Sequence, residues 1–252
     1  MSKCIEKIYS VSAVIGNGVC YAECAEQGAY MPNVNLFTNG ILLGNAAWCD
    51  AWLPEWKRLG LTNIAVSVHS VNRWKQAIAY GLVPLTITPY GSGYSGPWLN
   101  PETGETDYKY PVFEDIFANI RKHGIGVRTT LLLRRGEVDG WRSYKASVDR
   151  LIAMGSDNIT SWPVGLPDGS RSEYTPSRWG LATIRMWLKM NAKLCHGHVW
   201  GGGVYDYNGA ILRMTDYVTK HDPDLDFVRQ LVVFQDGTVA YSWIKDGSLC
   251  MK

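Results

Sequence analysis

Apolar and polar residues follow a recurring order along this chain, in which a helical pattern, a glycine and a β-rich run succeed one another. Apolar positions at helical spacing predict a helix over residues 46–59, ended by Gly60, and the apolar run 61–68 follows. The same order recurs three times: a helix over 71–80, Gly81 and the run 82–88; a helix over 112–123, Gly124 and the run 125–133; and a helix over 144–154, Gly155 and the run 157–164. Repeated units of this kind are typical of β/α crossovers, which form parallel sheets with helices outside. The pattern therefore predicts an α/β fold.

After Gly165 the pattern changes. Thr175 and Pro176 predict the N-cap and first turn of another helix, whose apolar stripe is Leu181, Ile184 and Leu188. Near the end of the chain, an Asp-Gly pair separates the β-branched runs 229–235 and 238–244, which predicts a β-hairpin. We therefore expect two parts. Residues 1–170 form the β/α part, and residues 171–252 form a C-terminal α+β extension with a helix and a hairpin, packed on the first part.

Composition narrows the classes of protein that are possible. With 252 residues, 46% of them hydrophobic, the chain can bury a substantial core. A net charge of +2 does not imply the basic face that nucleic acid requires. No apolar stretch approaches the roughly 20 residues that cross a bilayer, so no membrane is expected. The six cysteines without an export signal indicate a reducing, cytoplasmic location.

The first candidate chemistry lies near the N-terminus. The apolar run that begins at Tyr9 breaks at Gly16-Asn17-Gly18, and Cys20 and Cys24 follow at a spacing of four. This order places both thiols in a loop at the end of a strand, where thiolates can meet a metal. By itself the spacing is equally compatible with a buried or incidental pair of cysteines.

The context of this loop resembles the radical S-adenosylmethionine (radical SAM) superfamily. In that family the first barrel strand leads into a C-x-x-x-C-x-x-C loop, and Cys20 and Cys24 match its first two cysteines. The runs LFTNG (36–40), IAVSVHS (64–70) and VRTTLLLRRGEVD (127–139) are similar to the third, fourth and fifth strands of the family, and SWPVGLPDG (161–169) continues the spacing. The resemblance covers roughly residues 8–170.

The resemblance implies a partial (β/α) barrel with parallel strands, a 4Fe-4S cluster on Cys20 and Cys24, and S-adenosyl-L-methionine as cofactor. It places Asn39 and Ser67 near the cofactor. Arg128 is a charge inside an otherwise apolar strand, and it is the candidate partner for the cofactor carboxylate, or else pairs with a structural acid. An active enzyme would use an electron donor such as a flavodoxin or ferredoxin. The substrate is not indicated.

Two features depart from the family pattern. Gln27 stands at the position of the third cysteine, and the Gly-Gly-Glu-Pro motif of the second strand is absent. Only residues 25–35 separate the cysteine loop from the third-strand turn, as if one β/α unit had been lost. The alternative hypothesis is therefore a catalytically inactive family member that serves as a binding or scaffold protein. A β/α-barrel hydrolase with paired carboxylates is a third hypothesis, but no two acids pair convincingly.

Other candidate residues have plainer interpretations. Cys49 lies on a predicted helix and is expected to be a buried small apolar residue rather than a cluster ligand. His196 and His198 share one side of an extended segment, but without a third ligand a surface loop is the favoured interpretation. Asp168, Arg171 and Glu173 follow the last predicted strand of the β/α part and are weaker functional candidates.

Overall fold

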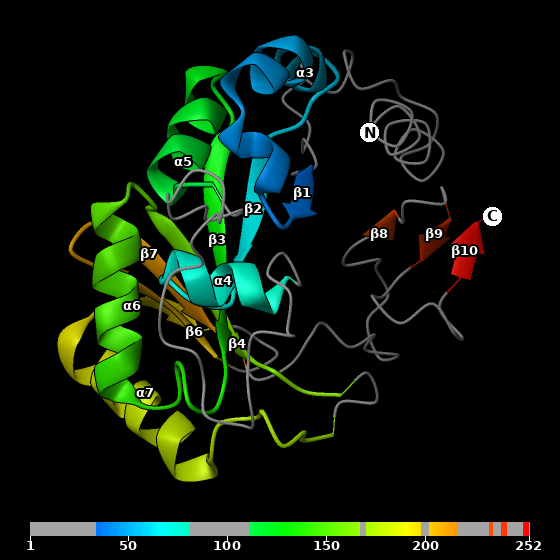
Figure 1. Ribbon diagram of the computed structural model, residues 1–252. Helices are drawn as coiled ribbons and strands as arrows, with labels where there is room; N and C mark the ends of the chain where they lie inside the picture. The colour runs from blue at the N-terminus through cyan, green and yellow to red at the C-terminus, as the bar shows by residue number, and fades with distance from the viewer. Residues whose placement is uncertain are drawn as a thin grey trace, which may run out of the picture.

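A computed structural model describes residues 34–80, 111–166, 170–197, 202–215, 232–233, 238–240 and 249–251. Its main element is a sheet of seven strands (Figure 1). In spatial order these are β1 (Asn35–Thr38), β2 (Asn63–Val68), β3 (Gly126–Leu133), β4 (Asn158–Pro163), β7 (Ala210–Met214), β6 (Gly203–Tyr207) and β5 (Lys193–Gly197). The first five strands in this order pair in parallel, and β6 and β5 complete the sheet in antiparallel fashion. The predicted α/β fold with a mostly parallel sheet is confirmed.

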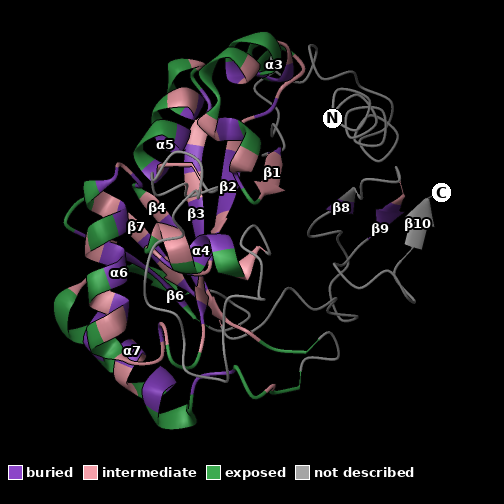
Figure 2. Ribbon diagram, in the orientation of Figure 1, coloured by how far each residue is buried: buried purple, intermediate pink, exposed green. Residues whose placement is uncertain are grey.

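Helices cover one face of this sheet. They are α3 (Ala46–Arg58), α5 (Phe113–Lys122), α6 (Trp141–Ala153) and α7 (Arg178–Asn191), while the short 3-10 helix η1 (Ile41–Gly44) follows β1 and α4 (Arg73–Ala79) follows β2. The inner sides of the helices are buried and their outer sides exposed (Figure 2). Their bounds agree with the predicted helices to within a few residues.

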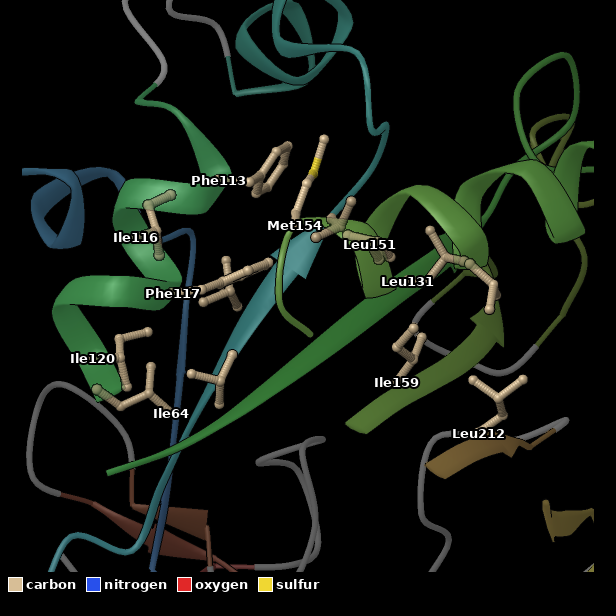
Figure 3. Close-up of a cluster of buried hydrophobic side chains, with 14 of the residues drawn as sticks. Ile64, Phe113, Ile116, Phe117, Ile120, Leu131, Leu151, Met154, Ile159 and Leu212 are labelled. Atoms are coloured by element: carbon tan, nitrogen blue, oxygen red, sulfur yellow. The ribbon is translucent and has the colours of Figure 1, made fainter. Parts of the chain in front are cut away.

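The core lies between these helices and the sheet. Phe113, Ile116, Phe117 and Ile120 project from α5, and Leu151 projects from α6 (Figure 3). They pack on the apolar side chains Ile64, Leu131, Ile159 and Leu212, one from each of four neighbouring strands. Burying this much apolar surface is the main stabilising contribution to the fold.

Glycines end the helices where the sequence predicted. Gly124 follows α5 with φ 66°, and Gly155 follows α6 with φ 102°. Both angles lie in the left-handed region, which glycine enters without the steric cost of a Cβ atom. Each glycine thus reverses the chain into the next strand.

The start of α7 differs from the prediction. Ser177, not Thr175, is the N-cap, and its Oγ accepts a hydrogen bond from the Gly180 amide at 2.9 Å. Thr175 instead donates its hydroxyl to the Val164 carbonyl at 2.7 Å and accepts from the Ser172 amide at 2.8 Å. Thr175 is therefore a buried residue that links Val164, just after β4, to the loop before α7. A local capping pattern does not reveal this role.

The C-terminal part continues the main sheet through β5, β6 and β7. A second, three-stranded sheet contains β8 (Val232–Val233), β9 (Val239–Ala240) and β10 (Leu249–Met251). β8 and β9 pair antiparallel, with Val233 opposite Val239, as expected for a hairpin, although the Asp-Gly turn itself lies outside the described residues.

Candidate functional site

The two faces of the main sheet have different chemistry. One face carries the apolar core. On the other face, the strand registers place Ser67 opposite Thr130, Thr130 opposite Thr160, and Thr160 opposite Arg213. Register partners point to the same side of a sheet. Ser67, Thr130, Thr160 and Arg213, which we call the polar row, thus cross four adjacent strands.

Arg128 lies on the same face, two residues before Thr130 on β3. Its Nε and Nη2 atoms donate to Thr160 Oγ1 at 3.0 and 2.8 Å. Arg213, on the other side of β4, donates through Nη1 to Asn158 Oδ1. Two guanidinium groups therefore flank β4. Among the described residues, neither has a carboxylate within ion-pair distance.

The surroundings lower the pKa of both arginines. Partial burial, and secondly the positive charge of Arg213, lower the pKa of Arg128 to about 10. Partial burial also lowers the pKa of Arg213. Both groups remain charged at neutral pH, because a guanidinium keeps its proton in proteins. Two like charges taken partly out of water are unfavourable unless an anion compensates them, so this face favours a negatively charged group.

The middle of the polar row contains an unsatisfied hydroxyl. Thr130 is 2% exposed, and its Oγ1 has no hydrogen-bond partner among the described residues. Leaving a buried hydroxyl unpaired costs about 1–3 kcal/mol. Thr130 is therefore available to donate to, or accept from, a ligand on this face.

Ser67 is half-buried, and its backbone is held firmly. Its carbonyl oxygen accepts from Gln76 Nε2 and from the Tyr80 hydroxyl, each at 2.9 Å. Burial raises the pKa of Tyr80 to about 12, so the phenol stays protonated and can donate. These contacts join α4 to β2 and leave the Ser67 side chain on the same face as Arg128.

Asn39 lies at the carboxyl end of β1 and is exposed. Its Oδ1 accepts from the Ile41 amide at 3.1 Å, while Thr38 Oγ1 accepts from the Gly40 amide at 3.2 Å. Gly40 has φ 79°, which favours glycine. The Thr-Asn-Gly sequence thus forms a tight turn at the rim of the sheet, beside the strand that carries Ser67.

The structure therefore brings Ser67 and Arg128 onto one face, with Asn39 at the neighbouring strand end. Sequence reasoning missed Thr130, Thr160 and Arg213. The signal in the sequence is that Thr130, Thr160 and Arg213 are polar residues inside β3, β4 and β7. Only the register shows that they form one row.

The remaining sequence candidates either lie outside the described residues or make contacts away from the polar row. Cys20, Cys24, Gln27, Asp168 and His198 lie outside the described residues. Cys49 is buried as predicted, donates to the Leu43 carbonyl at 3.4 Å, and has a pKa raised by burial. Such a thiol is a packing residue.

The structure also shows the positions of His196 and Arg171. His196 is exposed on β5, so the predicted loop is wrong at this position: pairing with β6 makes it a strand. Arg171 donates to the Pro176 carbonyl and thus supports the loop before α7. Within the described ranges, no group of three His, Cys, Asp or Glu side chains is arranged to hold a metal ion.

Comparison with known proteins assigns no family: no family model matches the chain, and a search of curated proteins finds no significant match. None of the helices in the described part of the chain combines the length and apolar character needed to cross a bilayer.

Proposed function

We propose that the polar face of the main sheet binds S-adenosyl-L-methionine and that the protein is a radical SAM-type enzyme acting on an unknown substrate. The observation that carries this proposal is the pair Arg128 and Arg213, two partly buried guanidinium groups on one face without a carboxylate partner among the described residues. The cofactor carries a carboxylate, which is a strong partner for arginine.

The chain's own residues have distinct roles in this proposal. Arg128 and Arg213 hold the cofactor carboxylate, and Thr130 offers a further hydrogen bond from the middle of the row. Ser67 lies at the ribose, as the resemblance implies, and Asn39 shapes the rim at β1. The order β1, β2, β3, β4 in the sheet, with helices on the other face, supports a partial β/α barrel whose inner face is polar.

Cys20 and Cys24 are the proposed ligands of a 4Fe-4S cluster. When bound, such a cluster supplies the electron that starts radical chemistry on the cofactor. Gln27 replaces the third thiolate of the family loop, and an amide is a poorer iron ligand than a thiolate, so we expect a labile cluster. A flavodoxin or ferredoxin is the proposed electron donor.

Equilibrium dialysis with labelled S-adenosyl-L-methionine tests the cofactor site. We expect Arg128→Met and Arg213→Met each to weaken binding by about tenfold or more, because each removes a charge-assisted hydrogen bond of about 1.5–3 kcal/mol. Arg121→Met is the matched control, since that arginine is paired with Asp157 on the exposed side of the structure. Equal binding by Arg128→Met and Arg121→Met would contradict the proposed site.

Anaerobic reconstitution with iron and sulfide tests the cluster separately. We expect a coloured protein that contains iron, and a loss of that iron in Cys20→Ala and Cys24→Ala. A colourless, iron-free native protein would refute the cluster, even if the cofactor still binds.

The absence of the third cysteine, replaced by Gln27, also favours a second candidate function. In this candidate the protein is a catalytically inactive family member that binds the cofactor. This candidate predicts that S-adenosyl-L-methionine binding survives in Cys20→Ala and that the native protein forms no 5′-deoxyadenosine with a chemical reductant. Formation of 5′-deoxyadenosine that depends on Cys20 would exclude it.

A further inference from the structure

A small pocket lies beyond the carboxyl ends of β2 and β3, between α4 and the turn that follows β3. Its volume is about 200 Å³, and its walls are formed by Lys75, Ile78, Arg134, Arg135, Gly136 and Glu137. Three of these side chains are cations and one is an anion. The pocket does not include the polar row, so its chemistry is independent of the proposed cofactor site.

The anion of this pocket is already neutralised. Glu137 Oε1 accepts from the Ser70 hydroxyl at 2.7 Å, and Oε2 accepts from Lys75 Nζ at 2.7 Å. Ser70 Oγ in turn accepts from the Asn72 amide at 3.1 Å. These bonds tie the end of β2, the start of α4 and the turn after β3 into one frame. Glu137 therefore acts as a structural brace, and its charge is matched by that of Lys75.

The other two cations have no matching acid in the part of the chain that the structure describes. Among the described residues, no carboxylate lies within ion-pair distance of Arg134 or Arg135. The Arg134 guanidinium lies over the ring of Tyr174, 4.8 Å from its centroid, and the Arg135 amide donates to the Tyr174 carbonyl at 2.8 Å. Tyr174 thus positions the Arg134 guanidinium and the Arg135 backbone without neutralising either charge. Asp139 also forms no ion pair with either arginine, and its Oδ2 accepts from the Gly136 amide at 2.8 Å.

Among the described residues, the pocket therefore has two more positive charges than negative ones, and hydrogen bonds hold its walls in place. Arginine side chains present planar forks of N–H donors that match the oxygens of a phosphoryl group, and Lys75 adds a point charge beside them. Ile78 supplies one apolar wall. A volume of about 200 Å³ accommodates a small oxyanion together with its water.

We propose that this pocket binds the phosphoryl group of a small ligand, with Arg134 and Arg135 as its principal partners and Lys75 as an auxiliary charge. Free phosphate and a phosphomonoester share this chemistry. They differ in whether the carbon part of the ligand adds contacts, for which Ile78 is placed.

Isothermal titration calorimetry of the full chain at low ionic strength tests the proposal, with inorganic phosphate and adenosine monophosphate as probes. We expect both probes to bind, and Arg135→Gln and Arg134→Gln each to weaken binding about tenfold. The exposed Arg58, paired with Glu55 on α3, provides the matched control Arg58→Gln, which should bind as the native chain does. Tighter binding of adenosine monophosphate would indicate a phosphomonoester, and equal binding would indicate free phosphate.

A charge-neutralising variant separates specific binding from damage to the fold. Glu137→Gln keeps an acceptor for Ser70 but removes the negative charge, so phosphate should bind severalfold tighter. No heat of binding from the native chain at millimolar phosphate, or equal losses in Arg135→Gln and Arg58→Gln, would overturn the proposal. S-adenosyl-L-methionine binding should be unchanged in Arg135→Gln, so the two proposals can fail separately.

Discussion

Arg128 on β3 directs two of its nitrogen atoms at a single oxygen atom, Thr160 Oγ1 on β4, at 3.0 and 2.8 Å. This contact crosses between neighbouring strands on the polar face of the sheet. It holds the guanidinium against β4, on the opposite side of that strand from Arg213. The charge is thereby positioned before any ligand arrives, which is the usual requirement for tight recognition of an anion.

Loss of the hydroxyl should have different effects on stability at the two threonines of the polar row. Thr160→Val leaves Arg128 Nε and Nη2 without their acceptor, so we expect a loss of about 1–3 kcal/mol in the free energy of unfolding. Thr130→Val removes a hydroxyl that has no partner among the described residues, so stability should be unchanged or slightly higher. Denaturant unfolding followed by circular dichroism measures the free energy of unfolding of both variants. An equal loss in both would contradict the hydrogen bonding described for Thr160 and Thr130.

Gly180 of α7 should not tolerate a side chain. A Cβ atom there would lie 2.0 Å from the Asp139 carbonyl oxygen, so the helix must shift away from the chain before α6. We expect Gly180→Ala to cost about 1–3 kcal/mol through overpacking. Gly197→Ala is the matched control, because a Cβ atom there meets nothing within 4 Å. Thermal melting of both variants should show a clearly lower midpoint for Gly180→Ala alone.

Leu131 is fully buried on the helix-covered face of β3. Leu131→Ala should reduce the free energy of unfolding by about 2–5 kcal/mol, because it removes buried apolar surface and leaves a cavity. Leu194 is 57% exposed on β5, and Leu194→Ala should change stability by less than about 0.5 kcal/mol. Chemical unfolding of the pair measures the difference, and similar losses would contradict the described packing.

Alkaline pH should destabilise the fold through its buried tyrosines. Burial raises the pKa of both Tyr144 and Tyr80 from 10.0 to about 12. Between these values the unfolded chain releases the phenol protons first, so stability is present below pH 10 and falls as pH rises toward 12. Arg128 and Arg213, whose pKa values burial lowers, act in the opposite direction, so the tyrosine contribution is measured by removing a single phenol.

Tyr144→Phe isolates one part of this effect. The variant should lose stability less steeply between pH 10 and 12, by roughly 2–3 kcal/mol over the window. Denaturant unfolding at a series of pH values gives the slope, and phenolate absorbance shows which tyrosines titrate late. An unchanged slope in Tyr144→Phe would show that its phenol titrates normally in the folded protein.

Local pattern alone predicted much of the secondary structure. The apolar spacing around Phe117 and Leu151 predicts α5 and α6, and Gly124 and Gly155 mark their ends, because helical periodicity and the left-handed turn are decided within a few residues. The same locality explains the error at α7. Thr175 has the chemistry of an N-cap, but a distant carbonyl, that of Val164, is a better-placed partner.

The candidate site depended on relationships that no local pattern contains. Arg128 stood out in the sequence as a charge in an apolar strand, yet its neighbours Thr160 and Arg213 come from later strands, brought beside β3 by sheet pairing. Likewise, Lys75 and Glu137 meet only because α4 and the turn after β3 lie at the same end of the sheet. The sequence by itself determined the apolar runs of β2, β3 and β4 and the helices between them, but not the strands β5, β6 and β7. Tertiary structure decided which of them share a face, because strand register is set by long-range packing of the apolar side chains.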